Sequence, residues 1–241
     1  MNSSIQTIPL INLAISFAPV LIALLILVKW SLNAVNALYG VVRMLAQLLL
    51  IGYFLAFIFE SDSALFILVI LAVMVFASSW IALGTVKTRQ RGLYTRAFAS
   101  IMLGGGLTLA LITQAVLNLD PWYRPQYMIP LAGMIFANSM NSVSLAAERF
   151  YAELARNVPY QEARNIAFQA SLIPVVNSLF AVGLVSLPGM MTGQILSGVS
   201  PLIAVRYQIV VMCMIFGSSA VTTACFLIWI KPLYDKYQAQ Q

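Results

Sequence analysis

Residues 172–198 read LIPVVNSLFAVGLVSLPGMMTGQILSG and are apolar enough to cross a lipid bilayer. This stretch contains two prolines, Pro174 and Pro188, and four glycines. Each proline removes a backbone hydrogen-bond donor and crowds the preceding turn, so we expect the helix to be kinked or interrupted. In lipid, the freed backbone groups are tolerated only where protein or a water-filled cavity covers them. We therefore predict that this segment lines a transport pathway or a seam between helices.

The composition is that of an integral membrane protein. Hydrophobic residues make up 61% of the 241 residues and charged residues 8%, whereas an ordinary soluble domain contains about 25% charged residues. At about 20 apolar residues per crossing helix, the chain has room for seven spans joined by short loops. The seven predicted spans cover residues 8–28, 36–59, 64–84, 97–117, 128–147, 172–198 and 207–230. We predict one all-α, polytopic membrane domain over residues 1–241.

The charges in the loops predict how the chain is oriented. The third loop carries Lys87, Arg89, Arg91 and Arg96, whereas Glu60 and Asp62 are the charges of the second loop. Because basic loops stay cytoplasmic, this pattern places the N-terminus outside and the C-terminus in the cytoplasm. The chain is then a multi-pass protein of the cell (inner) membrane, in contact with the lipid bilayer on all sides.

Several functions are disfavoured by what the sequence lacks. The net charge of +6 is spread over the ends of apolar runs rather than clustered on one face, so we expect no nucleic-acid partner. There is no histidine, and no Gly-Lys pair that a phosphate-binding loop would need. No acidic residue lies within a predicted span. We therefore expect no enzyme activity, no carboxylate-based metal site and no cofactor on this chain, although amide, carbonyl and thioether ligands remain possible.

Polar residues inside the spans are candidates for the transport path or for helix packing. Arg43 lies within the second run, where it either extends to the interface or takes part in the pathway. Asn138 and Asn141 share one face of the fifth span, as structural contacts between helices or as part of a polar path. The full set of candidates is Arg43, Asn138, Asn141, Ser186, Pro188, Gly189, Met190, Met191 and Gly193.

Two features of the sixth span have more than one interpretation. Gly189, Gly193 and Ser197 recur every four residues and form a flat stripe that another helix can approach closely. Met190 and Met191 are soft possible ligands, but methionine in a membrane protein commonly packs against lipid or core. The pair therefore stays unassigned at the level of the sequence.

Residues 148–171 form the one sizeable polar segment. Pro159 is suited to open a helix, after which Ala163 and Ala167 fall on one face while Glu162 and Arg164 fall on the other. Such a helix fits either a docking surface for a partner on the cytoplasmic side or a helix resting at the interface.

Three stretches resemble the FetB family, whose members are membrane subunits of bacterial ABC transporters implicated in iron export, with plant relatives linked to aluminium tolerance. They are IPLAGMIFANSM at 129–140, VGLVSLPGMMTG at 182–193 and RYQIVV at 206–211, and GVVRMLAQLLLIGY in the second span is similar as well. The resemblance implies a permease that forms a homodimer and docks two copies of a separate ABC ATPase, which would bind ATP and Mg.

The polar segment would correspond to the ATPase-coupling element of such permeases. The residues implied in coupling are Glu153, Arg156, Pro159, Glu162 and Arg164. The chain departs from the family pattern at Asn177 and Phe180, where an Asp and a Lys are expected. This departure weakens the implication that iron is the substrate and leaves the implied coupling to an ATPase in place.

The function that these observations favour is a permease subunit that exports iron or another metal ion by alternating access. The alternative is an ATP-independent transporter or channel built on the same interrupted helix, and a receptor-like or scaffold protein ranks third.

Overall fold

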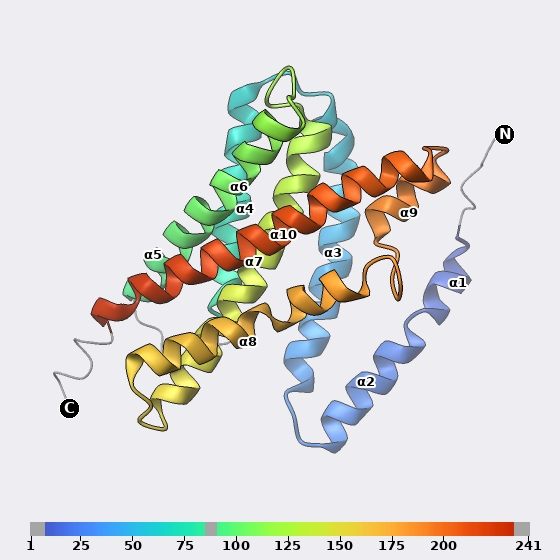
Figure 1. Ribbon diagram of the computed structural model, residues 1–241. Helices are drawn as coiled ribbons and strands as arrows, with labels where there is room; N and C mark the ends of the chain where they lie inside the picture. The colour runs from blue at the N-terminus through green and yellow to red at the C-terminus, as the bar shows by residue number, and fades with distance from the viewer. Residues whose placement is uncertain (1–7, 85–90, 234–241) are drawn as a thin grey trace. The chain divides into compact units, whose positions relative to one another are not determined.

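The computed structural model describes residues 8–84 and 91–233. Within these ranges the regular structure is helical, apart from one isolated bridge between Val182 and Ser186 (Figure 1). The predicted all-α fold is therefore confirmed. The chain divides into two compact units, Met1–Ser61 and Asp62–Gln241.

The first unit consists of an interrupted helix followed by a long one. Its helices are α1 (Leu10–Ile15), α2 (Ala18–Lys29) and α3 (Ala34–Phe59). The side chain of Asn33 caps α3 by accepting a hydrogen bond from the backbone N–H of Asn36 at 3.0 Å. Arg43 lies on α3 and is exposed within the chain.

The second unit holds the remaining helices. These are α4 (Ala64–Ala82), α5 (Arg91–Ser100), η1 (Ile101–Gly105), α6 (Gly106–Leu111), η2 (Ile112–Val116), α7 (Pro125–Leu154), α8 (Tyr160–Ala181), α9 (Gly189–Leu196) and α10 (Pro201–Trp229). The four elements from α5 to η2 follow one another without a break, with η1 and η2 as π-helical turns. A proline opens α7 and α10 at the first helical position, where no backbone donor is needed.

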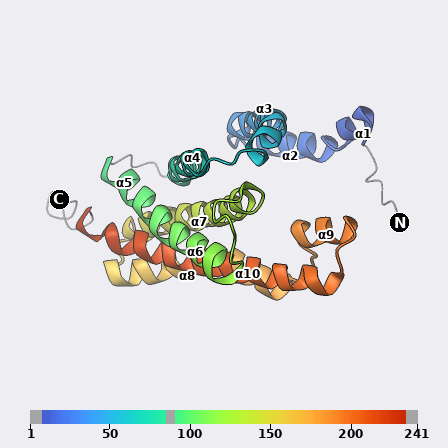
Figure 2. The same cartoon turned by 90° about the horizontal axis from the view of Figure 1, so that it is seen from above.

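Helix α7 lies at the centre of this unit. It packs against α10, α8 and α4, and Figure 2 shows α4 on one side of it and α8 and α10 on the other. Ile135, Val143 and Phe150 are buried along its length. The helix continues to Leu154, two turns beyond the predicted end of the fifth span, because Phe150 and Glu153 are also buried there.

Small and hydroxyl-bearing residues bring η1, α7 and α10 close together. A Cβ atom on Gly104 would lie 2.8 Å from the backbone nitrogen of Thr222. The hydroxyl of Thr222 in turn donates to that of Ser139 across 3.4 Å. Close approach of this kind between small residues is typical of helix packing in membranes.

Five helical stretches are long and apolar enough to cross a membrane. They are Leu10–Lys29, Ala34–Phe59, Ala64–Ala82, Gly92–Val116 and Pro201–Leu233, and they match five of the seven predicted spans. Helix α7 is not among them because its asparagines and serines lower its hydropathy, and α8 is not because its first half is polar. The number of seven spans and the orientation are therefore not confirmed.

The predicted sixth span is not one helix. Helix α8 begins after Pro159, as predicted, but it passes through Pro174 and ends only at Ala181. A proline within a helix costs one backbone hydrogen bond, and the buried side chains of Ser171 and Val175 on either side hold the helix in place. The interruption falls at residues 182–188, where Gly183 adopts a φ of +83°, and α9 starts after Pro188.

Candidate functional site

A cavity of about 380 Å³ lies between α7, α8, α9 and α10. Six of the residues predicted for the transport path line it, and they come from segments about 50 residues apart. These are Asn138 and Asn141 from α7, Ser186 and Pro188 from the interruption, and Gly189 and Met190 from α9. The structure thus brings the two groups of sequence candidates to one site.

Each long helix contributes a stripe of residues at helical spacing. From α7 the cavity receives Met134, Asn138, Asn141, Ser142 and Leu145. From α8 it receives Ser171, Pro174, Val175 and Ser178, and from α10 it receives Gln208, Val211, Met212 and Ile215. Spacings of three and four residues place each set on one helix face.

Sequence reasoning missed Gln208, which is the most deeply buried amide of the cavity. The residue is 5% exposed, and its Oε1 atom has no hydrogen-bond partner among the described residues. The signal was present, because Gln208 is an amide within an apolar run and Met212 follows it by one turn. Pairing it with Asn138 required knowing that α10 packs against α7.

The polar side chains around the cavity direct their donors into their own helices. The amide Nδ2 of Asn138 donates to the carbonyl of Met134 at 2.8 Å. The hydroxyl of Ser171 donates to the carbonyl of Phe168 at 2.7 Å, and the hydroxyl of Ser178 donates to that of Pro174 at 3.0 Å. The two hydroxyls then offer a ligand their oxygen lone pairs, and Asn138 offers its amide oxygen and its second amide hydrogen.

Two other candidates of the second unit, Met191 and Gly193, do not border this cavity. Met191 borders a neighbouring hollow of about 310 Å³ together with Gly183, Gln208 and Cys213. A Cβ on Gly193 would meet no atom within 4 Å, so the predicted close packing along that stripe is not formed within the chain. Arg43 belongs to the first compact unit and stays a prediction.

A carboxylate- or thiolate-based metal site is not visible in the part of the chain that the structure describes. No group of three or more histidine, cysteine, aspartate and glutamate residues gathers there. A metal ion at the cavity would therefore have to be held by amide, hydroxyl and thioether groups.

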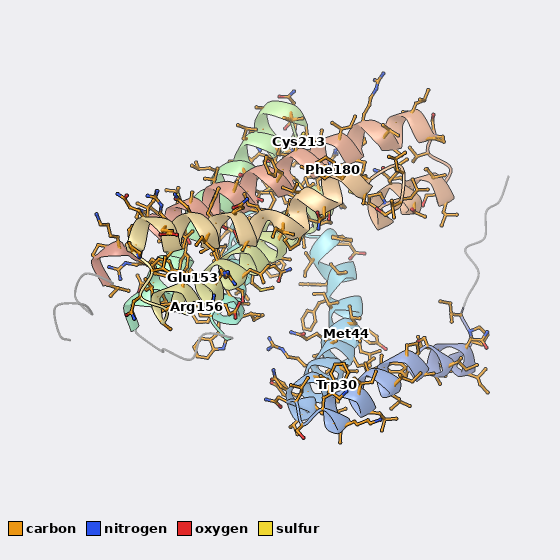
Figure 3. All side chains as sticks on the ribbon, turned by 60° about the horizontal axis from the view of Figure 1, so that its bottom comes forward. Trp30, Met44, Glu153, Arg156, Phe180 and Cys213 are labelled. Carbon is orange, nitrogen blue, oxygen red and sulfur yellow. The ribbon has the colours of Figure 1, made fainter. Side chains whose placement is uncertain are left out.

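The predicted coupling residues lie at the turn between α7 and α8. Glu153 is buried, and its Oε1 lies 2.6 Å from a guanidinium nitrogen of Arg149 and 3.8 Å from one of Arg156 (Figure 3). Glu153 therefore stabilises the turn from inside, whereas Arg156 and Glu162 are exposed. Any role of these residues in coupling stays a prediction.

The first turn of α8 is fixed to the end of α10. The hydroxyl of Tyr160 donates to the carbonyl of Leu227 at 2.8 Å, and the ammonium of Lys231 lies 5.7 Å from the centre of the Tyr160 ring. Along α8, Ala163 and Ala167 are buried while Glu162 is exposed, so the predicted two-faced pattern is confirmed.

Positive charge gathers at this end of the second unit. Arg149 and Arg156 flank the turn, Arg164 lies one turn into α8, and Lys231 follows α10. Burial raises the pKa of the Tyr151 phenol, which the positive charge of Arg96 partly offsets. The phenol is thus neutral at physiological pH, and the charge of this end is set by these basic residues together with Glu148, Glu153 and Glu162.

The sequence of this chain is similar to a family of membrane proteins. Residues 10–234 match the model of an uncharacterised protein family, UPF0014. The UPF0014 membrane protein slr1647 of Synechocystis is 37% identical over 196 residues, which cover 75% of this chain and 76% of that protein. No solved structure gives a significant match.

Two further relatives are similar over nearly the whole chain. The probable iron export permease protein FetB of Escherichia coli K12 is 32% identical over 245 residues, covering 94% of this chain and 93% of FetB. The protein ALUMINUM SENSITIVE 3 of Arabidopsis thaliana is 33% identical over 244 residues, covering 92% of this chain and 88% of that protein. The resemblance predicted from the sequence motifs is therefore confirmed, and the chain belongs to the UPF0014 family of membrane proteins.

Proposed function

We propose that this chain is the membrane-spanning permease subunit of an ABC transporter that exports iron or another metal ion. The observation that carries the proposal is the continuity of α8. The same helix presents the exposed Glu162 at its start and lines the cavity with Ser171 and Ser178 near its end. A movement imposed at the polar end is transmitted to the cavity over about 24 Å, since each helical residue rises about 1.5 Å.

In this mechanism a separate ATPase supplies the energy. The ATPase binds ATP and Mg, and it contacts the turn between α7 and α8 on the cytoplasmic side. Closure of the ATPase shifts the start of α8, and the cavity between α7, α8, α9 and α10 opens alternately to the two sides of the membrane. The name of the Escherichia coli relative, an iron export permease protein, supports a transport function of this class.

The proposal includes a topology and an assembly. Seven crossings, with the N-terminus outside, place Arg149, Arg156, Arg164 and Lys231 on the cytoplasmic side of the inner membrane, as the positive-inside rule requires. The permease forms a homodimer in which each subunit binds one ATPase. The outer face of α9 is available for that contact, because a Cβ on Gly193 would meet nothing within the chain.

The coupling contact is tested by removing two of its charges. We expect the double variant Glu162→Gln/Arg164→Gln to insert normally but to lose stimulation of the ATPase, because the exposed Glu162 and the half-buried Arg164 lie in the first two turns of α8. The measurement is the ATPase rate of the copurified complex in lipid nanodiscs.

A second pair of charges gives the matched control. Glu60→Gln/Arg206→Gln also removes one acid and one base, from exposed positions predicted to lie on the outer side, and should leave stimulation intact. Unchanged stimulation in the Glu162/Arg164 variant would contradict the contact. Flux through proteoliposomes that contain this chain alone would favour the alternative, an ATP-independent transporter or channel.

A further inference from the structure

We propose that the cavity between α7, α8, α9 and α10 is a binding site for a soft, singly charged metal cation. The thioether sulfurs of Met134, Met190 and Met212 and the carbonyl oxygen of Gln208 are its ligands. This inference names the substrate class of the proposed transport site and so rests on the proposed function.

The three methionines reach the cavity from three different helices. Met134 belongs to α7, Met190 to α9 and Met212 to α10. Methionine in a membrane protein often only fills space, but methionines that line one cavity from three separate elements can supply a thioether ligand set of the kind that selects Cu(I) over harder ions. The next residue, Met191, does not border this cavity but a neighbouring hollow, which Gln208 and Met212 also line.

The oxygen atoms around the cavity also favour a cation. The buried Oε1 of Gln208 has no hydrogen-bond partner among the described residues and is an acceptor. The hydroxyls of Ser171 and Ser178 and one amide hydrogen of Asn138 are donated to carbonyls of their own helices. The oxygens of these four side chains are therefore acceptors that a positively charged ligand can use.

The charge of the lining limits the charge of the ion. Every residue that borders the cavity is neutral, and none is a histidine, a cysteine or an acid. The free energy of moving an ion out of water rises with the square of its charge. No acidic side chain at the cavity would neutralise a divalent or trivalent ion, so binding such an ion would carry a large free-energy cost. A singly charged soft ion has the smallest cost and the best match to sulfur.

Silver ion is the probe for this site, because Ag(I) is soft, singly charged and stable in air. The experiment uses the full chain with Cys213→Ser and Cys225→Ser, since both cysteines are free and would bind silver themselves. Calorimetric titration of this variant in lipid nanodiscs should give one site. Because loss of a supporting partner alone weakens metal sites about 10–100-fold, Met190→Leu and Met212→Leu should each weaken Ag(I) binding at least about tenfold.

Matched controls come from adjacent methionines. Met214→Leu is two residues from Met212 and borders neither hollow. Met191→Leu is one residue from Met190 and does not border the cavity, although its own hollow shares Gln208 and Met212 with it. Both should bind Ag(I) as the parent does. X-ray absorption of the bound ion in the cysteine-free chain should show sulfur neighbours, which can then come only from methionine, and this measurement does not depend on how any methionine variant folds.

Three results would overturn the inference. They are equal Ag(I) affinity in all four methionine variants, bound Ag(I) without sulfur neighbours, or displacement of Ag(I) by equimolar Fe(II). The ATPase rate of the same preparation is measured without silver. A chain that stimulates the ATPase but does not bind Ag(I) refutes this site alone, and a chain that binds Ag(I) without recruiting an ATPase refutes the coupling alone.

Discussion

Two buried polar residues of the second unit differ in whether a partner lies near their side-chain oxygen atoms. Glu153 lies 2.6 Å from a guanidinium nitrogen of Arg149, and its charge is compensated where it is buried. Gln208 is buried to a similar extent, but its Oε1 has no hydrogen-bond partner among residues 8–84 and 91–233. The ion pair stabilises the turn between α7 and α8. The amide of Gln208 instead leaves an acceptor at the cavity.

The contact between Gly104 and Thr222 gives a prediction at the scale of one residue. Gly104→Ala should lower stability by about 1–3 kcal/mol, because the new Cβ would lie 2.8 Å from a backbone nitrogen and 2.9 Å from the Cα atom of Thr222. Gly106→Ala is the control, since a Cβ there meets nothing within 4 Å and alanine favours the helix by about 0.5–1 kcal/mol. Thermal unfolding in detergent should move in opposite directions for the two variants, and equal shifts would contradict the close approach.

Which residues the sequence could reveal depends on where their partners lie. Asn138, Asn141 and Met190 stand out because they interrupt apolar runs or adjoin a proline. Gln208 gave the same local signal but is recognisable as part of the cavity only once α10 is packed against α7. Burial of Glu153 was hidden for the same reason, since a charged residue in a polar segment looks exposed.

Helix α8 is the element in which sequence and structure differ most. The periodicity after Pro159 predicted its amphipathic start, and that part is confirmed. The two prolines predicted a kinked or interrupted helix, and the interruption is present at residues 182–188, directly before α9. It does not fall at Pro174, where packing on both sides of the proline compensates for one lost hydrogen bond. The helix ends before Gly183, whose backbone conformation is not helical.

The turn at Gly183 gives the prediction for this element. Its φ of +83° is a conformation that costs an L-residue about 1–2 kcal/mol, so Gly183→Ala should lower the midpoint of thermal unfolding. A Cβ there meets no atom within 4 Å, which means that the loss would be conformational and not steric. Gly106→Ala, on helical backbone in α6, should leave the midpoint unchanged or raise it. A Gly183 variant as stable as the Gly106 variant would contradict a strained turn at position 183.

At the scale of the whole molecule, composition and loop charge predicted a helical membrane protein, and the helices and the family both agree. The number of membrane crossings follows less directly from the sequence than the fold class does. Asparagines and serines in α7 and the polar start of α8 place both helices outside the group that hydropathy recognises. Polar residues of α7 and α8 that line the cavity thus also lower the hydropathy of these helices, so that hydropathy does not identify them as membrane spans.

Labelling of single cysteines tests whether α7 crosses the membrane and whether the segment formed by α8 and α9 does. In the chain with Cys213→Ser and Cys225→Ser, we expect Asp120→Cys and Ser200→Cys to react with a membrane-impermeant maleimide in intact cells. Glu162→Cys should react only after permeabilisation.

All three positions are exposed, and none of the substitutions removes a basic residue that sets orientation. Position 120 precedes α7 and position 162 follows it, so labelling of both from outside would mean that α7 does not cross. Positions 162 and 200 flank α8 and α9 in the same way. Labelling of position 162 alone from outside would keep seven crossings but reverse the chain, and would place the proposed ATPase contact on the wrong side of the membrane.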